Sequence, residues 1–193
     1  MKNMLLIIAL LSLIACGGGG GSNTVEVKET KAPEATYVFG DSTSNSMLDK
    51  EYTAWPYLLA DISGNTVDWD ARPGITLKYY DVESAANKLT KRYKYTVLAL
   101  GGNDVIQEIP LIDILYQYEE TLEFLKSKGY EPVCHTYSYS ITAAINDLNN
   151  GIKEICNRRG YKTILSGSET FDGVHPTNQA SMITAENAWR LLY

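Results

Sequence analysis

Histidine, cysteine and long basic runs are scarce in this chain, and each scarcity argues against a class of function. The 193 residues include two histidines and three cysteines, and their spacing matches no recognisable zinc-binding pattern. No run of lysine and arginine exceeds two residues, and the net charge is −6 at pH 7, which argues against binding to nucleic acid. No internal repeat or coiled-coil heptad indicates a structural protein. The sequence therefore predicts no metal, no organic cofactor and no nucleic-acid partner.

The N-terminal segment resembles the export signal of a bacterial lipoprotein. Lys2 precedes an apolar stretch over residues 4–14 that is too short to span a bilayer comfortably. Residues 13–16 read Leu-Ile-Ala-Cys, which resembles the lipobox in which the cysteine is lipidated and becomes the new N-terminus. An ordinary secretory signal cut elsewhere and an uncleaved anchor are the alternatives. We therefore expect lipidation at Cys16 and a membrane-anchored protein of the bacterial cell envelope, facing the periplasm or the exterior.

Composition divides the chain into three parts. Residues 1–15 form the predicted lipoprotein signal peptide. Residues 16–35 begin with the lipidated cysteine and continue with a glycine run, a composition typical of a flexible tether. Residues 36–193 are long enough for one domain with a sizeable core. We expect this last part to hold the chemistry.

From residue 36 onward, short apolar segments alternate with amphipathic helical patterns. The predicted strands cover residues 37–39, 67–69, 95–100, 131–137 and 161–165. The predicted helices cover residues 55–62, 82–93, 111–125, 141–155 and 182–192. The nearly continuous apolar run at 95–100 is typical of a strand that is buried on both faces. This alternation predicts an α/β fold, a three-layer α/β/α sandwich with a five-stranded parallel sheet.

Four polar or glycine-containing motifs follow the predicted strands. They are Gly40-Asp41-Ser42, Gly74, Gly101-Gly102-Asn103-Asp104 and Asp172-Gly173-Val174-His175. The carboxyl ends of parallel strands lie at one edge of a sheet, and ligands bind there. The sequence therefore predicts that these motifs form one site.

Ser42, His175 and Asp172 supply the three groups that nucleophilic acyl transfer needs. A serine hydroxyl needs a base to take its proton, and the base needs a group that orients it. Asp172 lies three residues before His175, so its carboxylate can hold one ring nitrogen while the other faces the serine. A helix-capping turn at Ser42 and a loop histidine with an incidental acidic neighbour are the alternatives. His135 lies within a predicted strand, and we expect a structural role for it.

Asn103 and Gly74 are candidates for stabilising a negatively charged oxygen. A side-chain amide that follows a buried strand can donate a hydrogen bond to a developing oxyanion, and the two glycines before Asn103 allow a close approach. The backbone N–H of Gly74 can donate to the same oxygen. Ordinary turns, or a helix cap at Asn103, are the alternatives.

In this order and at these distances, the four motifs resemble the ordered blocks of the SGNH, or GDSL, hydrolase superfamily. The resemblance covers residues 36–193, and the segment Trp-Pro-Tyr-Leu-Leu at 55–59 is similar to the helix that follows the serine block. It implies a flavodoxin-like SGNH hydrolase fold that needs no cofactor. The Gly-x-Ser-x-Gly elbow does not occur in the sequence, which argues against the ordinary α/β-hydrolase plan.

The resemblance implies a role for each matching residue. Ser42 would be the nucleophile, and His175 would be the general base, oriented by Asp172. Asp104 would be structural. Many members have leucine after the serine, whereas this chain has Thr43, which changes the expected shape of the acyl pocket. The oxyanion hole would consist of the Ser42 N–H, the Gly74 N–H and the Asn103 side chain.

The function implied by the resemblance is that of a serine esterase that forms an acyl-enzyme. No long apolar segment suggests a deep acyl tunnel, so the sequence favours short-chain acyl or acetyl esters, including those on glycans. A lysophospholipase- or thioesterase-type lipid deacylase and a non-catalytic glycan- or protein-binding lipoprotein are the alternatives. Tyr137 and Tyr139 lie near the end of a predicted strand and are candidates for substrate contact. The sequence indicates no oligomeric state.

Cys134 and Cys156 leave two possibilities open. An exported protein meets an oxidising compartment, where a disulfide forms if the two Cα atoms lie within about 7 Å. The alternative is a pair of buried free thiols.

Overall fold

The computed structural model describes residues 34–45, 53–137 and 143–193. The predicted signal peptide at 1–15 and the lipidation site at Cys16 lie outside the described residues. The same holds for all but the last two residues of the predicted tether at 16–35, and for Tyr139. The description that follows concerns the domain predicted for residues 36–193.

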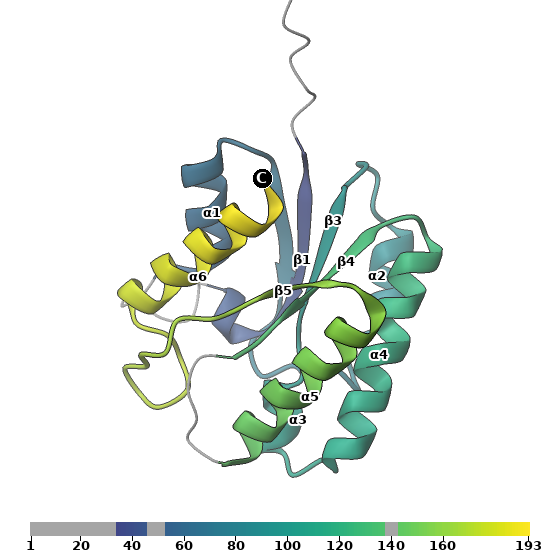
Figure 1. The fold of residues 1–193 in the computed structure, drawn as a ribbon, viewed down its shortest axis with the longest axis vertical. Coiled ribbons are helices and arrows are strands. Elements are labelled where there is room, and N and C mark those ends of the chain that lie inside the picture. The colour runs from purple at the N-terminus through teal and green to yellow at the C-terminus, as the bar shows by residue number, and fades with distance from the viewer. Residues whose placement is uncertain (1–33, 46–52, 138–142) are drawn as a thin grey trace, which may run out of the picture. The chain divides into compact units, whose positions relative to one another are not determined.

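Five parallel strands form the central sheet (Figure 1). The strands are β1 (Thr36–Gly40), β2 (Val67–Ala71), β3 (Tyr95–Ala99), β4 (Glu131–His135) and β5 (Lys162–Ile164). Their order in the sheet is β2-β1-β3-β4-β5. The predicted fold class is confirmed, and each predicted strand differs from the observed one by no more than two residues at either end.

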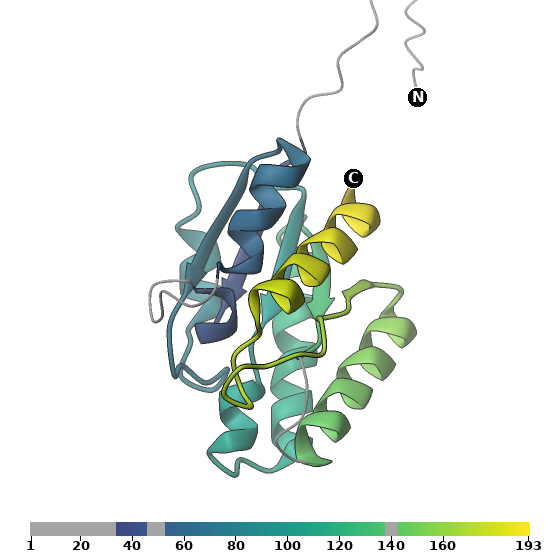
Figure 2. The same cartoon turned by 90° about the vertical axis from the view of Figure 1, so that its left-hand side faces the viewer.

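Helices cover both faces of the sheet, as parallel strands with helical crossovers require. Helices α1 (Trp55–Ser63) and α6 (Asn178–Leu192) pack on one face, and Figure 2 shows them side by side. Helices α2 (Val82–Asn87), α4 (Leu111–Ser127) and α5 (Ala143–Arg159) pack on the other face. Two short helices, η1 (Ser42–Ser44) and α3 (Gly102–Ile106), follow β1 and β3 directly.

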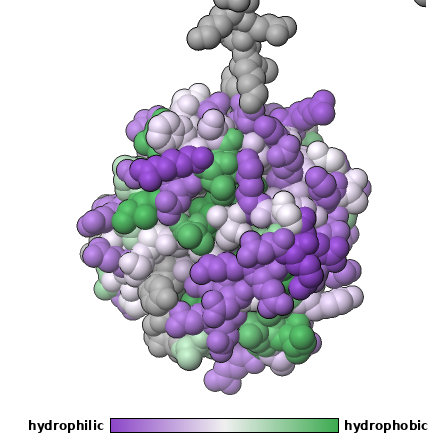
Figure 3. Space-filling view, in the orientation of Figure 1, coloured by the Kyte–Doolittle hydropathy of each residue, from purple (hydrophilic) through white to green (hydrophobic). Residues whose placement is uncertain are grey.

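The surface is mostly hydrophilic on the face that Figure 3 shows, and apolar side chains gather there in separate patches. Across the described ranges, no helix combines the length and the apolar character needed to cross a membrane.

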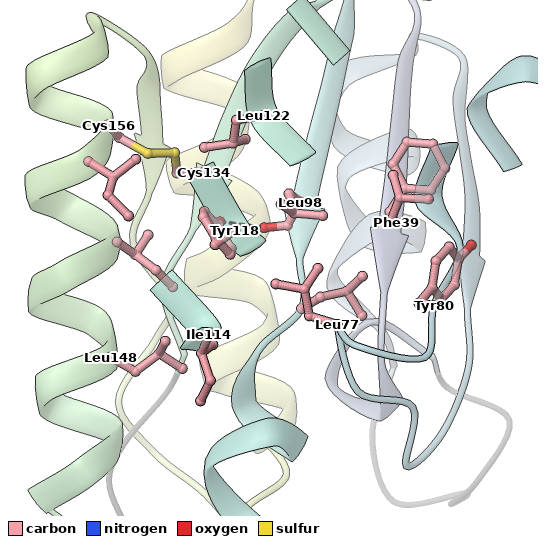
Figure 4. Close-up of a cluster of buried hydrophobic side chains, with 14 of the residues drawn as sticks. Phe39, Leu77, Tyr80, Leu98, Ile114, Tyr118, Leu122, Cys134, Leu148 and Cys156 are labelled. Atoms are coloured by element: carbon pink, nitrogen blue, oxygen red, sulfur yellow. Dashed lines mark hydrogen bonds between the residues drawn. A yellow bond between two sulfur atoms is a disulfide. The ribbon is translucent and has the colours of Figure 1, made fainter. Parts of the chain in front are cut away.

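Alternation of side chains along the strands explains the two apolar cores. Val38 and Val97 face the side of α1 and α6, whereas Phe39 and Leu98 face α2, α4 and α5. Figure 4 shows the second core, in which the Tyr118 hydroxyl donates a hydrogen bond of 2.7 Å to the Leu98 carbonyl oxygen. Because consecutive residues of β1 and β3 are buried on opposite faces, apolar residues stand next to one another in the sequences of both strands.

The helix predicted over 82–93 is shorter than expected. It ends at Asn87, and the chain then extends so that two later side chains reach β2. Lys91 Nζ and the Tyr93 hydroxyl contact Asp68 Oδ2 at 3.0 Å and 2.6 Å. Tyr93 is buried, so the apolar spacing of this segment reflects burial in a connecting segment and not a longer helix.

A disulfide joins β4 to α5, between Cys134 and Cys156 (Figure 4). The two Cα atoms are 6.5 Å apart, and the cysteines are separated by 22 positions. The sequence left this pairing open. Closing a loop of this length in the unfolded chain corresponds to a stabilisation of about 3 kcal/mol in the chain-entropy account.

Candidate active site

The strand order creates a crevice at the carboxyl ends of β1 and β3. From β1 the chain moves to β2 on one side, and it then returns to β3 on the other side of β1. Connections leave in opposite directions at such a switch point, and ligands of open α/β sheets bind there. Ser42 follows β1 and Asn103 follows β3, so the two motifs flank the switch point.

The turn that carries Ser42 is held tightly against the end of β1. A Cβ atom on Gly40 would lie 2.6 Å from Ser44 Cβ, so the close approach of the turn requires glycine. The Asp41 carboxylate accepts hydrogen bonds from the Thr43 N–H at 2.9 Å and the Thr43 hydroxyl at 2.8 Å. These contacts cap η1 and leave the Ser42 side chain 6% exposed at the crevice.

Ser42, His175 and Asp172 form a hydrogen-bonded row. His175 Nε2 lies 3.0 Å from Ser42 Oγ, and His175 Nδ1 lies 2.6 Å from Asp172 Oδ2. A carboxylate accepts only, so we assign the proton of the neutral ring to Nδ1. Nε2 is then the acceptor that faces the serine hydroxyl.

Local hydrogen bonds hold Asp172 in its charged form. Its Oδ1 atom accepts the backbone N–H groups of Val174 at 2.8 Å and of His175 at 2.7 Å. Burial raises the pKa of Asp172, but the hydrogen bonds from the His175 ring and from these two amides outweigh burial and lower the pKa to about 2. The Phe171 N–H donates a hydrogen bond of 3.1 Å to the His175 carbonyl oxygen, and this contact closes the loop. The histidine loop is therefore built around an ionised Asp172.

Asn103 and Asp104 fasten the loop that follows β2. Asn103 Nδ2 donates to the Ile75 carbonyl oxygen at 3.0 Å, and the Leu77 N–H donates to Asp104 Oδ2 at 2.7 Å. Asp104 is buried, and these contacts agree with the structural role predicted for it. The Asn103 amide has a second N–H, for which no hydrogen bond occurs among the described residues.

Gly74 lies in an exposed turn of this loop. Its φ of +70° falls in the left-handed region that favours glycine. The carbonyl oxygen of the next residue, Ile75, accepts the hydrogen bond from Asn103, so Asn103 holds the loop one residue beyond Gly74. Gly74 does not line the cavity beside Ser42.

Tyr137 connects the end of β4 to the serine turn. Its hydroxyl donates to Asp41 Oδ2 at 2.9 Å, and its ring packs so closely on Gly102 that a Cβ atom there would lie 2.7 Å from it. The second glycine of the Gly-Gly-Asn-Asp motif is therefore explained by Tyr137. Tyr137 also lines the cavity, in the region where the sequence suggested substrate contact.

A cavity of about 400 Å³ opens beside Ser42. Sequence motifs identified its polar wall but missed its apolar wall. Their positions in the sequence could have identified these apolar residues, because they lie in or beside the histidine loop, α3 and the first turn of α5. The missed apolar residues are Val105, Ile106, Ala144, Ile145 and Val174.

His135 has the structural surroundings that the sequence predicted. It is 2% exposed and stacks on Trp55 with ring centroids 5.1 Å apart, and burial lowers its pKa to about 3. Its Nε2 lies 3.2 Å from Ser166 Oγ, but among the residues that the structure describes, Nδ1 has no hydrogen-bond partner and therefore no orienting carboxylate. The Ser166 hydroxyl donates instead to the Thr136 carbonyl.

Residues 34–45, 53–137 and 143–193 contain no group of three or more histidine, cysteine, aspartate or glutamate side chains placed to hold a metal ion.

Comparisons place this fold among solved esterases and lipolytic proteins. A member of the lipolytic G-D-S-L protein family from Veillonella parvula DSM 2008 matches with a TM-score of 0.68 and 15% identity, over 82% of this chain and 98% of that one. The acetyl xylan esterase AlAXEase matches with a TM-score of 0.69 and 15% identity, over 82% of this chain and 100% of that one. The psychrotrophic esterase EstA from Pseudoalteromonas sp., in a structure inhibited by monoethylphosphonate, matches with a TM-score of 0.60 and 12% identity, over 82% and 96% of the two chains.

At these identities the likeness shows a shared fold. The sequence matches no protein-family model and no curated protein.

Proposed function

We propose that this chain is a serine esterase of the SGNH hydrolase superfamily that hydrolyses carboxylic esters. The observation that carries the proposal is the row in which Ser42 Oγ lies 3.0 Å from His175 Nε2 and Asp172 lies 2.6 Å from His175 Nδ1. The fold shared with solved esterases and the four ordered sequence motifs support it.

The first half-reaction in this proposal transfers the acyl group to Ser42. His175 Nε2 takes the hydroxyl proton as Ser42 Oγ attacks the ester carbonyl. The resulting imidazolium is stabilised by the charged Asp172. As the tetrahedral intermediate collapses, the bond to the alcohol oxygen breaks and His175 returns the proton to the departing alcohol. The acyl-enzyme remains on Ser42.

The second half-reaction returns the enzyme to its starting state. His175 takes a proton from water, the hydroxide attacks the acyl-enzyme, and the carboxylic acid leaves as the proton returns to Ser42 Oγ. The proposed oxyanion donors in both halves are the Ser42 N–H, the Gly74 N–H and the Asn103 side chain. Removal of one such donor costs about 3 kcal/mol of transition-state stabilisation in comparable sites.

A non-catalytic binding role is a weaker account of the same geometry. A binding surface needs neither a base at hydrogen-bond distance from a serine nor a carboxylate on the far side of that base. The contacts of His175 with Ser42 and Asp172 supply both. We therefore prefer the catalytic proposal, in which the ester can be part of a glycan, a lipid or a small molecule.

We further propose that the protein is attached to the bacterial cell envelope through a lipid on Cys16. The support is the sequence alone, because Leu-Ile-Ala-Cys at 13–16 resembles a lipobox. In this proposal, the segment from residue 16 to residue 35 would join the lipid to the domain that carries the ester site.

Hydrolysis of p-nitrophenyl esters by the full chain tests the proposed function. We expect turnover by the wild type, and a loss of at least a thousandfold in kcat with Ser42→Ala, as removal of a catalytic nucleophile produces. Ser166→Ala is the matched control, because Ser166 also contacts a histidine but that histidine has no carboxylate partner. No turnover of any ester, or turnover unchanged by Ser42→Ala, would refute the assignment.

A further inference from the structure

The cavity beside Ser42 has one polar end and one apolar body. Ser42 and Asn103 lie at the polar end, together with Gly102. The body lies between α3, the first turn of α5 and the histidine loop. Its apolar side chains are those of Val105, Ile106, Ala144, Ile145 and Val174. An acyl group attached to Ser42 Oγ can enter this body directly.

The size of the cavity limits what it can hold. A volume of about 400 Å³ is within the usual range of small-molecule sites. At roughly 30 Å³ for each water-sized group, it holds on the order of a dozen non-hydrogen atoms. An acetyl group would leave most of the apolar wall without a partner, whereas a long fatty acyl chain would extend beyond it.

Charge in the cavity wall favours a neutral acyl chain. The described lining residues include two carboxyl groups, Asp41 and Glu108, and no lysine or arginine. Asp41 is buried and accepts hydrogen bonds from Thr43 and Tyr137. Glu108 is exposed at the rim, just beyond α3. Among the described lining residues, an anionic group in the acyl chain would therefore meet carboxyl groups and no cation.

On the basis of the proposed function, we propose that the acyl group of the substrate is a neutral aliphatic chain of about four to eight carbons, held in this cavity. Each methylene that enters the apolar body is removed from water in the transition state. Removal of one buried methylene from water is worth about 0.8 kcal/mol, which corresponds to about a fourfold gain in kcat/KM for each added carbon. The gain in kcat/KM should stop at the chain length that fills the cavity.

A chain-length series measures this directly. The full chain is assayed with p-nitrophenyl acetate, butanoate, hexanoate and octanoate at concentrations below micelle formation. We expect kcat/KM to rise about fourfold for each carbon up to hexanoate or octanoate. A flat or falling series, with turnover that still depends on Ser42, would overturn this inference and leave the esterase assignment intact. Absence of Ser42-dependent turnover on every ester would instead remove the proposed function.

Two adjacent alanines at the start of α5 provide a matched pair of variants. Ala144 lines the cavity, whereas Ala143 does not, and both are exposed. We expect Ala144→Phe to fill part of the cavity and to lower the ratio of hexanoate to acetate kcat/KM at least tenfold. Ala143→Phe should keep the wild-type ratio. Equal ratios in the two variants, both folded by circular dichroism, would place the acyl chain elsewhere.

A terminal charge on the chain tests the electrostatic part. The mono-p-nitrophenyl ester of adipic acid has the same chain length as the hexanoate but ends in a carboxylate. We expect kcat/KM to be at least tenfold lower for this ester than for the hexanoate. We expect Glu108→Gln to reduce this difference in kcat/KM between the two esters. Equal rates for the charged and neutral esters would contradict the neutral preference.

Discussion

Two carboxyl groups flank Ser42, and their surroundings move their pKa values in opposite directions. Burial raises the pKa of Asp41 by more than the hydrogen bonds from Thr43 and Tyr137 lower it, so the pKa of Asp41 lies above its ordinary value. Burial also raises the pKa of Asp172, but the hydrogen bonds around it prevail and bring the pKa to about 2. Asp172 therefore stays ionised beside His175, whereas Asp41 serves to hold the serine turn.

The pair of Tyr137 and Asp41 yields a prediction at this scale. Tyr137→Phe removes a donor that lowers the pKa of the buried Asp41 carboxyl. We expect the free energy of unfolding at pH 7 to fall by about 1.5–3 kcal/mol, the usual loss when a charged group loses a hydrogen bond. Urea denaturation of the wild type and the variant measures it.

The sign of the pH dependence separates this account from a simple packing defect. The folded state of the variant holds the Asp41 proton more tightly, so its deficit in stability should grow as pH rises through the folded-state pKa of Asp41, which burial holds above the ordinary value of about 4, and should shrink below it. Tyr116→Phe is the matched control, because Tyr116 is 68% exposed and its hydroxyl forms no hydrogen bond within the part of the chain that the structure describes. A deficit that is the same at pH 4 and pH 8 would contradict the role given to Asp41.

At the scale of secondary-structure elements, the sequence predicted the sheet well and the short helices poorly. Strands buried on both faces, such as β3, stand out as apolar runs. The end of α4 was also predictable, because Gly129 adopts a φ of +86° where the helix closes. In contrast, α3 has five residues and begins with glycine, so it shows neither helical periodicity nor a capping side chain.

The apolar cavity could not be predicted because it depends on distances between elements. Val105 and Ile145 lie 40 positions apart and belong to α3 and α5, which pack together although α4 and β4 separate them in the chain. The disulfide depends in the same way on how α5 lies on β4. Local patterns specify each element, whereas these two features arise from packing between them.

At the scale of the whole molecule, the sheet brings together residues that are far apart in the chain. Ser42 and His175 are separated by 133 positions, yet both follow strands that end at the same edge. Sequence reasoning could predict this meeting because parallel strands place their carboxyl ends together. It could not predict that Asp41 would turn away from His175 and bind Tyr137.

The proposed lipid anchor also belongs to this scale. We expect the wild-type protein to sediment with membranes of a bacterial host and Cys16→Ser to appear in the soluble fraction, because the predicted lipid would attach to the Cys16 thiol. Cell fractionation followed by immunoblotting measures the distribution, with Cys156→Ser as a cysteine control. Continued membrane attachment of Cys16→Ser would rule out lipidation at that residue.

The central claim is that Ser42 is an activated nucleophile, and covalent capture tests it most directly. A fluorophosphonate reacts with such a serine, and mass spectrometry of the digested protein identifies the modified residue. Our account predicts one adduct on Ser42, absent in Ser42→Ala and formed much more slowly in His175→Ala, which lacks the base. No adduct, or an adduct on Ser166 beside His135 in place of Ser42, would contradict it.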